Sequence, residues 1–332
     1  MGTIQQGAKQ VLNECLDLKK GEIIVIITDK KTLEIGKAFE KEARKITNKI
    51  KFFILEDFGK RPLQKLPIEI ECAIKQANIS LYAAEKIGNE NYTIRRPIRL
   101  IGIKYGRHIN MPSITKEIMK TGMCVNHKKL WKFSKKIYDI VKNAKEIVVK
   151  TDKGTNIIAK FISKYKWINS NGDYRKRPQQ GANLPGGEVW TYPKEINGIA
   201  IIDGVLGDYF TTKYGILEET PIKVKIKNGR IIKISCKNKK LEKEFKNYVK
   251  TDKNSSRIGE FALGTNIFLK KLIGVILQDE KFPGVHIAVG NPYPEETNAP
   301  FSSKVHCDGI IKNPTIFVDG KMLMKKGKYL NI

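Results

Sequence analysis

The first part of the chain alternates short, wholly apolar runs with segments whose apolar residues recur every three or four positions. Residues 23–28 (IIVIIT) are apolar and mostly β-branched, which is typical of a strand buried on both faces. The next segment places Leu33, Phe39 and Ile46 on one face of a helix. Such alternation predicts a sheet whose strands are joined by crossover helices.

The same pattern continues to about residue 145. We expect further strands at 51–55, 79–83 and 98–103, and helices at 68–76 and 130–141. Ser113 precedes residues with a helical pattern, and its hydroxyl is predicted to cap that helix. Residues 1–145 are therefore predicted to form an N-terminal alternating α/β domain.

Beyond residue 145 the pattern becomes richer in strands, and turn dipeptides separate the runs. Hairpin turns are predicted at Lys153-Gly154, Asn228-Gly229 and Asp319-Gly320. The polar stretch 169–182 is predicted to be a long loop, and loops of this length often carry function. The fold class is thus α/β with two domains, 1–145 and a strand-rich domain at 146–332.

The chain is strongly basic, with a formal net charge of +28 over 332 residues. Attraction to polyanions is one interpretation of this charge. A lysine-rich bias spread over all exposed faces is the favoured one, because no RNA-binding aromatic signature and no zinc finger are visible. We therefore expect no specific nucleic-acid partner.

The remaining bulk features favour a cytoplasmic protein without a membrane segment. No apolar run approaches the roughly 20 residues that a membrane span needs. The first residues lack the basic start and apolar stretch of a signal peptide. The 5 cysteines are odd in number and widely spaced without a CxxC, which is typical of reduced thiols.

Carboxylates and imidazoles, the usual ligands of a catalytic divalent cation, gather in short motifs of the second domain. The motifs are NLPGGEV, GEFALG, VHIAVG, NPYP and VHCDG, which supply Glu188, Glu260, His286, Tyr293, His306 and Asp308. On an extended segment His306 and Asp308 point to one side and Cys307 to the other. Cys307 is therefore predicted to be a buried neighbour of the site.

Each candidate also has an ordinary explanation. Glu188 could be a loop carboxylate in water, and His286 a core histidine with a satisfied hydrogen bond. His306 and Asp308 could form a hydrogen bond alone, and Tyr293 could be a packed aromatic. Their joint occurrence in one domain favours a metal site over these separate explanations.

The other two histidines, His108 and His127, lie among basic and polar residues without a nearby acidic partner. A surface position, or a supporting role beside a site, is expected for both.

The motifs together resemble the thermophilic metalloprotease family of dinuclear aminopeptidases, the group that contains aminopeptidases T and S. NLPGGEV, GEFALGTN, DEK followed by VHIAVG, a tyrosine seven residues after that histidine, and VHCDG occur in the family's order and at its approximate spacing. Weaker similarity runs from LDLKKGEIIVIITD to KTDKGTNI, so the resemblance covers most of the chain.

The resemblance implies a metal-dependent hydrolase that removes N-terminal residues from peptides or aminoacyl amides. It implies two divalent cations (Zn, Co or Mn) and a homodimer of two-domain subunits. The six implied ligands are Glu188, Glu260, His286, Tyr293, His306 and Asp308, and Glu260 and Tyr293 are the implied catalytic residues. Glu260 is the implied bridge between the two ions. The chain is shorter than typical members, which bears on the shape of its substrate cavity.

Two other interpretations stay open at this point. Ring-cleaving dihydroxypyridine dioxygenases resemble the same family and use one ferrous ion held by two histidines and an aspartate. His286, His306 and Asp308 would suffice for that chemistry and would leave the other candidates superfluous. The third interpretation is a basic nucleic-acid-binding protein with a vestigial site.

Overall fold

The computed structural model describes residues 2–176 and 182–330. Its chain forms two compact units, Met1–Lys129 with Gly172–Gly186, and Leu130–Asn171 with Gly187–Ile332. The domain boundary that the sequence predicts near residue 145 stays a prediction. Part of the predicted loop 169–182, residues 177–181, lies outside the described residues.

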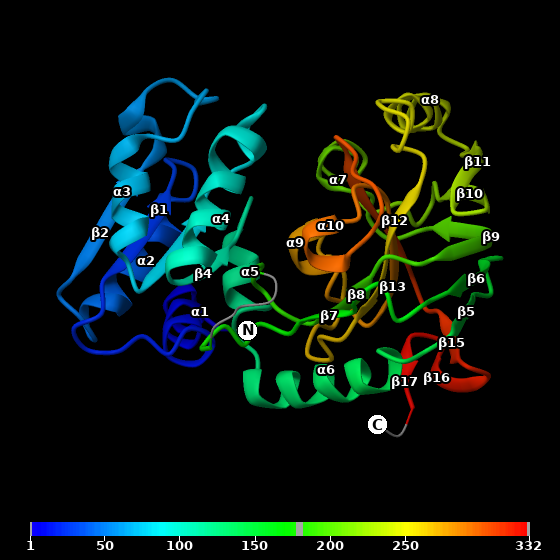
Figure 1. The fold of residues 1–332 in the computed structure, drawn as a ribbon, viewed down its shortest axis with the longest axis horizontal. Coiled ribbons are helices and arrows are strands. Elements are labelled where there is room, and N and C mark those ends of the chain that lie inside the picture. Colours follow the sequence, from blue (N-terminus) through cyan, green and yellow to red (C-terminus); the bar gives the residue numbers. More distant parts are fainter. Residues whose placement is uncertain (1, 177–181, 331–332) are drawn as a thin grey trace. The chain divides into compact units, whose positions relative to one another are not determined.

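The first unit is built on a parallel four-stranded sheet with the strand order β2-β1-β3-β4 (Figure 1). The strands are β1 (Ile24–Thr28), β2 (Ile50–Ile54), β3 (Ile79–Ala83) and β4 (Arg107–Asn110). The helices are α1 (Ile4–Gln10), α2 (Leu33–Arg44), α3 (Ile68–Gln76), α4 (Arg96–Tyr105) and α5 (Lys116–Lys120). Short helical turns are Val11–Cys15, Leu55–Phe58 and Asn91–Arg95.

Helices cover the parallel sheet, as the alternating pattern predicted. Val25 and Ile27 of β1 share one apolar cluster with α3 and α4, and α2 packs on β1 and against α1. Every residue of β1 is buried, which explains its wholly apolar and β-branched composition. The predicted strands at 51–55 and 79–83 and the helix at 68–76 are confirmed.

Two local predictions in this unit are wrong. Residues 98–103 lie in α4 rather than in a strand. A proline in the first turn of α4 suits a helix start, and Leu100 in the apolar run is 48% exposed, as one side of a surface helix should be. The helix cap is Thr115, whose hydroxyl accepts from the Ile118 N–H, whereas Ser113 adopts a left-handed backbone with φ 55°.

Both histidines expected near the surface are instead fully buried. His108 Nδ1 lies 2.8 Å from the hydroxyl of Ser80, and burial lowers the pKa of His108 to about 3. His127 Nδ1 lies 3.5 Å from Cys15 Sγ, and burial again lowers its pKa. Neutral core imidazoles are therefore the correct description, and the polar residues nearby in sequence point elsewhere.

The second unit contains two antiparallel sheets and all of α6 (His127–Val141) from Leu130 onward (Figure 1). In the larger sheet the order is β11-β10-β9-β6-β5-β15-β16-β17. Its strands are β5 (Glu146–Lys150), β6 (Asn156–Lys160), β9 (Glu195–Ile202), β10 (Ile222–Lys227), β11 (Arg230–Ser235), β15 (Thr315–Val318), β16 (Lys321–Lys325) and β17 (Lys328–Tyr329). The three predicted hairpins join β5 to β6, β10 to β11 and β15 to β16, and all three are confirmed.

The smaller sheet has the order β14-β13-β12-β8-β7. Its strands are β7 (Ile168–Ser170), β8 (Glu188–Thr191), β12 (Ile258–Gly264), β13 (Gly284–Gly290) and β14 (His306–Ile311). The remaining helices of the unit are α7 (Asp208–Tyr214), α8 (Lys239–Tyr248), α9 (Ile276–Asp279) and α10 (Pro294–Thr297). One apolar core contains side chains from both sheets and from α6 and α8, so one face of the smaller sheet packs into that core.

No helix within residues 2–176 and 182–330 is long and apolar enough to cross a membrane. The 5 cysteines are all free thiols.

A buried ion network fastens the carboxyl ends of β1 and β3. Arg61, only 4% exposed, donates to Asp29 at 2.5 Å and to Glu90 at 2.5 Å. Arg61 also donates to the backbone carbonyl of Glu85, whose N–H donates to Asp29. Burial alone would raise the pKa of Asp29, but hydrogen bonds from Thr32, Glu85 and Arg61 hold it below its usual value.

We expect Arg61→Met to destabilise the protein by about 3–5 kcal/mol, because two buried carboxylates lose their cation. Urea unfolding measures the change. Arg44→Met is the matched control, since Arg44 pairs with Glu40 on the surface of α2 and should cost less than about 1 kcal/mol. Equal losses in the two variants would contradict a role for burial in the Arg61 network.

Candidate metal centre

Alternate residues of four neighbouring strands point to the free face of the five-stranded sheet. Register pairs Glu260 of β12 with Ala288 of β13, and Ala288 with Asp308 of β14. It also pairs Ala262 with His286, and Gly264 with Glu188 of β8. Paired residues share a face, so all the candidate carboxylates and imidazoles of these strands lie on one side.

Small side chains separate the polar ones on this face. Ala262, Gly264 and Ala288 occupy the positions between the carboxylates and imidazoles. Larger residues there would cover the face with aliphatic carbon, whereas alanine and glycine leave the polar atoms able to converge. The residues between them in sequence, such as Phe261, Leu263 and Ile287, enter the core on the opposite side.

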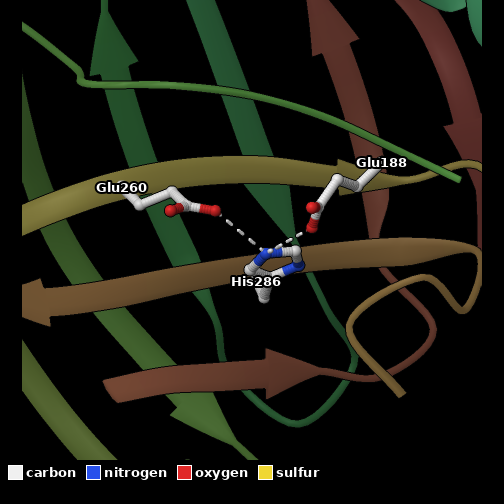
Figure 2. Close-up of side chains that lie close together, drawn as sticks. All are labelled: Glu188, Glu260 and His286. Atoms are coloured by element: carbon white, nitrogen blue, oxygen red, sulfur yellow. Dashed lines mark hydrogen bonds and ion pairs between the residues drawn. The ribbon is translucent and has the colours of Figure 1, made fainter. Parts of the chain in front are cut away.

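One group of converging atoms comes from Glu188, Glu260 and His286, all of them buried (Figure 2). His286 Nε2 lies 3.3 Å from Glu260 Oε1 and 3.7 Å from Glu188 Oε2. Glu188 is thus not a solvated loop carboxylate, because it opens β8 with 6% of its surface exposed. Ligand-type atoms of the three residues lie within 4.8 Å of one another.

A second group shares Glu260 and adds His306 and Asp308. His306 Nε2 lies 3.7 Å from Glu260 Oε2 and 3.2 Å from Asp308 Oδ1. His306 Nδ1 lies 2.8 Å from the backbone carbonyl of Asn291. Because a carbonyl only accepts, Nδ1 carries the proton of the neutral ring, and the lone pair of Nε2 can bind a ligand. His306 and Asp308 therefore lie close together as part of a larger cluster, and not as the isolated pair of the ordinary explanation.

Cys307 has the predicted orientation, since its thiol lies in the apolar core behind the sheet with 3% exposure. Burial raises the pKa of this thiol well above its usual value, so it stays protonated at neutral pH. The alternation of β14 thus separates a chemical face from a packing face within three residues.

Tyr293 closes one side of the cluster from the loop before α10. Its ring centroid lies 4.8 Å from that of His306 and 5.9 Å from that of Trp190, with an edge-on arrangement to Trp190. Its backbone is left-handed, with φ 50° and ψ 68°. A bulky residue rarely adopts this conformation, and such strain is characteristic of functional positions.

The electrostatics of the cluster are those of a site that attracts cations. Burial disfavours the charged forms of His286 and His306, yet both pKa values are raised. Glu260 and the other carboxylates raise that of His286, and Tyr293, Asp308 and Glu260 raise that of His306. Burial likewise raises the pKa of Glu260. The pKa of Asp308 is lowered despite its burial, chiefly by the charge of His306.

Sequence reasoning missed two charged residues, Glu280 and Lys281. Lys281 has no exposed surface, and its Nζ lies 2.5 Å from Glu188 Oε1 and 2.6 Å from Glu280 Oε1. Burial raises the pKa of Glu280 to about 8. The only signal in the sequence was the DEK that precedes VHIAVG, which looks like an ordinary surface turn.

Comparison with known proteins identifies the class. The family model described as thermophilic metalloprotease (M29) matches residues 126–328, and the chain belongs to that family. A search of curated proteins found no match. The protein is accordingly a metal-dependent aminopeptidase with a divalent-metal cofactor, as the motif resemblance implied.

Two solved structures share the fold. The 2,5-dihydroxypyridine dioxygenase of Pseudomonas putida KT2440 aligns with a TM-score of 0.72 and 14% identity, covering 99% of this chain and 97% of that one. Wild-type AmpT from Thermus thermophilus aligns with a TM-score of 0.69 and 14% identity, covering 99% of each chain. At this identity the two similarities show the fold alone, and the predicted α/β fold class is confirmed.

The alternation along β14 gives a direct test of the two faces. His306→Ala should lower the metal content of the purified protein, because it removes an imidazole from the polar cluster. Cys307→Ala should leave the metal content unchanged and cost about 1 kcal/mol of stability, since it removes one buried atom from the core. Elemental analysis and thermal unfolding provide the two readouts, and metal loss in Cys307→Ala would contradict the assignment.

Proposed function

We propose that this aminopeptidase holds two divalent cations in the cluster and removes N-terminal residues from peptides or aminoacyl amides. The proposed ligands are Glu188, Glu260, His286, Tyr293, His306 and Asp308. The single observation that carries the proposal is the position of Glu260, which belongs to both groups of converging atoms.

The two carboxylate oxygens of Glu260 face two different histidines. Oε1 lies 3.3 Å from His286 Nε2, and Oε2 lies 3.7 Å from His306 Nε2. A carboxylate placed in this way could help to hold two ions. Glu188 and His286 would help to hold one of them, and His306 and Asp308 the other.

Glu188, Glu260 and Asp308 bring three carboxylates into a buried site. Buried charges need partners, so cations bound there would offset the charge of these carboxylates.

The bound cations supply a water of lowered pKa and polarise the scissile carbonyl. The protein's own residues position the parts. Glu260 sets the distance between the two sides, and the Asn291 carbonyl holds the His306 ring in the orientation that presents Nε2. Tyr293, packed between His306 and Trp190, places its phenol beside the same cluster, where it can contact substrate or an ion.

Oxygen and nitrogen ligands without a thiolate suit Zn, Co or Mn, and we propose an ion from this set. The family resemblance supports a homodimer. The 5 free cysteines support a cytoplasmic location.

A mononuclear dioxygenase site is the alternative that the Pseudomonas putida similarity raises. It would need His286, His306 and Asp308 to converge by themselves. Within the described residues these three do not form a group of mutually close ligand atoms without a glutamate. Glu260 instead belongs to both groups and Glu188 to one of them, which favours the dinuclear hydrolase.

We expect Glu260→Gln to reduce hydrolysis of aminoacyl chromogenic amides by about 10²–10⁴-fold, the scale of losing a central acid–base or bridging group. Glu244→Gln on α8 is the control with the same chemical change, since Glu244 pairs with Lys213 and belongs to neither group of converging ligand atoms. Circular dichroism should show the same fold for both variants. Full activity in Glu260→Gln would remove Glu260 as bridge or base.

Metal stoichiometry is expected to be two divalent ions per chain in the active protein. Removal with a chelator should abolish amide hydrolysis, and adding back Zn, Co or Mn should restore it. One iron per chain together with oxygen uptake on a dihydroxypyridine would favour the dioxygenase instead. Hydrolysis that is unchanged after removal of the metal would end the proposal.

A further inference from the structure

Lys281 is a charged side chain with no exposed surface directly behind a proposed metal ligand. Its Nζ lies 2.5 Å from Glu188 Oε1 and 2.6 Å from Glu280 Oε1. A buried ammonium is tolerated only when it is paired and hydrogen-bonded, and these two carboxylates provide that environment. Glu280 lies outside both groups of converging ligand atoms. Lys281 thus links a carboxyl outside the cluster to Glu188, which is part of it.

The local backbone is built to bring Lys281 to this place. The carboxylate of Asp279 accepts from the N–H groups of Ile273, Gly274 and Val275, which fixes the loop that leads into α9. The chain then passes so close to β12 that a Cβ on Gly264 would lie 1.8 Å from the Phe282 carbonyl oxygen. Glycine at 264 is thus a condition for Lys281 to reach Glu188, the residue that pairs with Gly264 in the sheet.

We infer that Lys281 is a positioning residue, which holds one carboxylate oxygen of Glu188 so that only the other is presented to a metal ion. The inference rests on the proposed function, because it assigns a partner to one of the proposed ligands.

The two oxygens of Glu188 face different neighbours. Oε1 lies against Lys281 Nζ, and Oε2 lies 3.7 Å from His286 Nε2, on the side of the cluster. The charge-assisted hydrogen bond turns Oε1 toward the ammonium and leaves Oε2 on the side of the cluster. Glu188 therefore presents one oxygen to the cluster, and its orientation depends on the Lys281 contact. Partners behind a metal ligand commonly change affinity or activity by about 10–100-fold.

The charge of Lys281 and its position beside Glu188 have opposite effects on cation binding. Removing a positive charge next to Glu188 would strengthen cation binding, whereas freeing Glu188 from its orientation would weaken it.

The test is Lys281→Met, titrated with Co²⁺ after metal removal in the full-length protein. Methionine keeps much of the aliphatic stem and removes the ammonium. We expect the Kd for Co²⁺ at the position that Glu188 helps to form to rise about 10–100-fold. The visible absorption of bound Co²⁺ should change as well, because Glu188 can then bind through both oxygens or through neither.

A double variant, Glu280→Gln with Lys281→Met, removes both members of the Glu280–Lys281 pair. It leaves no carboxyl at position 280 without its partner, so this variant serves where Lys281→Met fails to fold. We expect the same weakening of Co²⁺ binding. Lys153→Met is the control, since Lys153 pairs at 3.1 Å with the buried Asp203 outside the cluster, and its Co²⁺ binding should match that of the unaltered protein.

The outcomes separate the inference from the proposed function. Two tightly bound Co²⁺ ions in the unaltered protein, with affinity and spectrum retained or affinity increased in the double variant, would overturn the role of Lys281 alone. Fewer than two Co²⁺ ions in the unaltered protein would overturn the dinuclear site. If that protein binds no Co²⁺, both proposals fail.

Discussion

The carboxylates gathered on one buried sheet face repel one another, and the rest of the structure has to offset that repulsion. Glu188, Glu260 and Asp308 lie within a few ångströms of two imidazoles, with little water to screen them. Positive charge stabilises such a cluster, and the carboxylates help to raise the pKa values of His286 and His306. Cations bound there would relieve a cost that the fold itself creates, so metal binding would be coupled to the stability of this unit.

The five-stranded sheet supports this cost by dividing its residues between two tasks. Phe261, Leu263 and Ile287 enter the shared apolar core, and the alternate positions carry the polar atoms. Ala262 and Ala288 keep the polar face open. Because the core side is so well packed, the strands cannot shift to relax the carboxylates, and a register slip of one residue would bury every ligand in the core.

Period and turn chemistry were enough to predict most elements, the hairpins and the side on which His306 and Asp308 lie. The apolar run 98–103 misled because a short apolar run does not distinguish a strand from one face of a helix. The meeting of Glu260 with His286 required the β12–β13 register and its irregularity near Ile258, which depend on distant residues. Lys281 was invisible for a related reason, since a lysine in a DEK turn shows no sign of burial until the loop is placed.

The fold does not by itself select the chemistry, since similar folds occur in a dioxygenase and in AmpT. His286, His306 and Asp308 are the residue types that a single iron would need, but His286 lies in one group of ligand atoms and His306 and Asp308 in the other. Glu260 is distinctive because its two oxygens face both histidines, so it would join the two halves of the proposed dinuclear site. Burying Glu188 costs free energy, which its ion pair with the buried Lys281 offsets. A three-ligand iron site would require neither residue. The glutamates and Lys281 are thus the part of this chain that would distinguish the proposed hydrolase site from a three-ligand iron site.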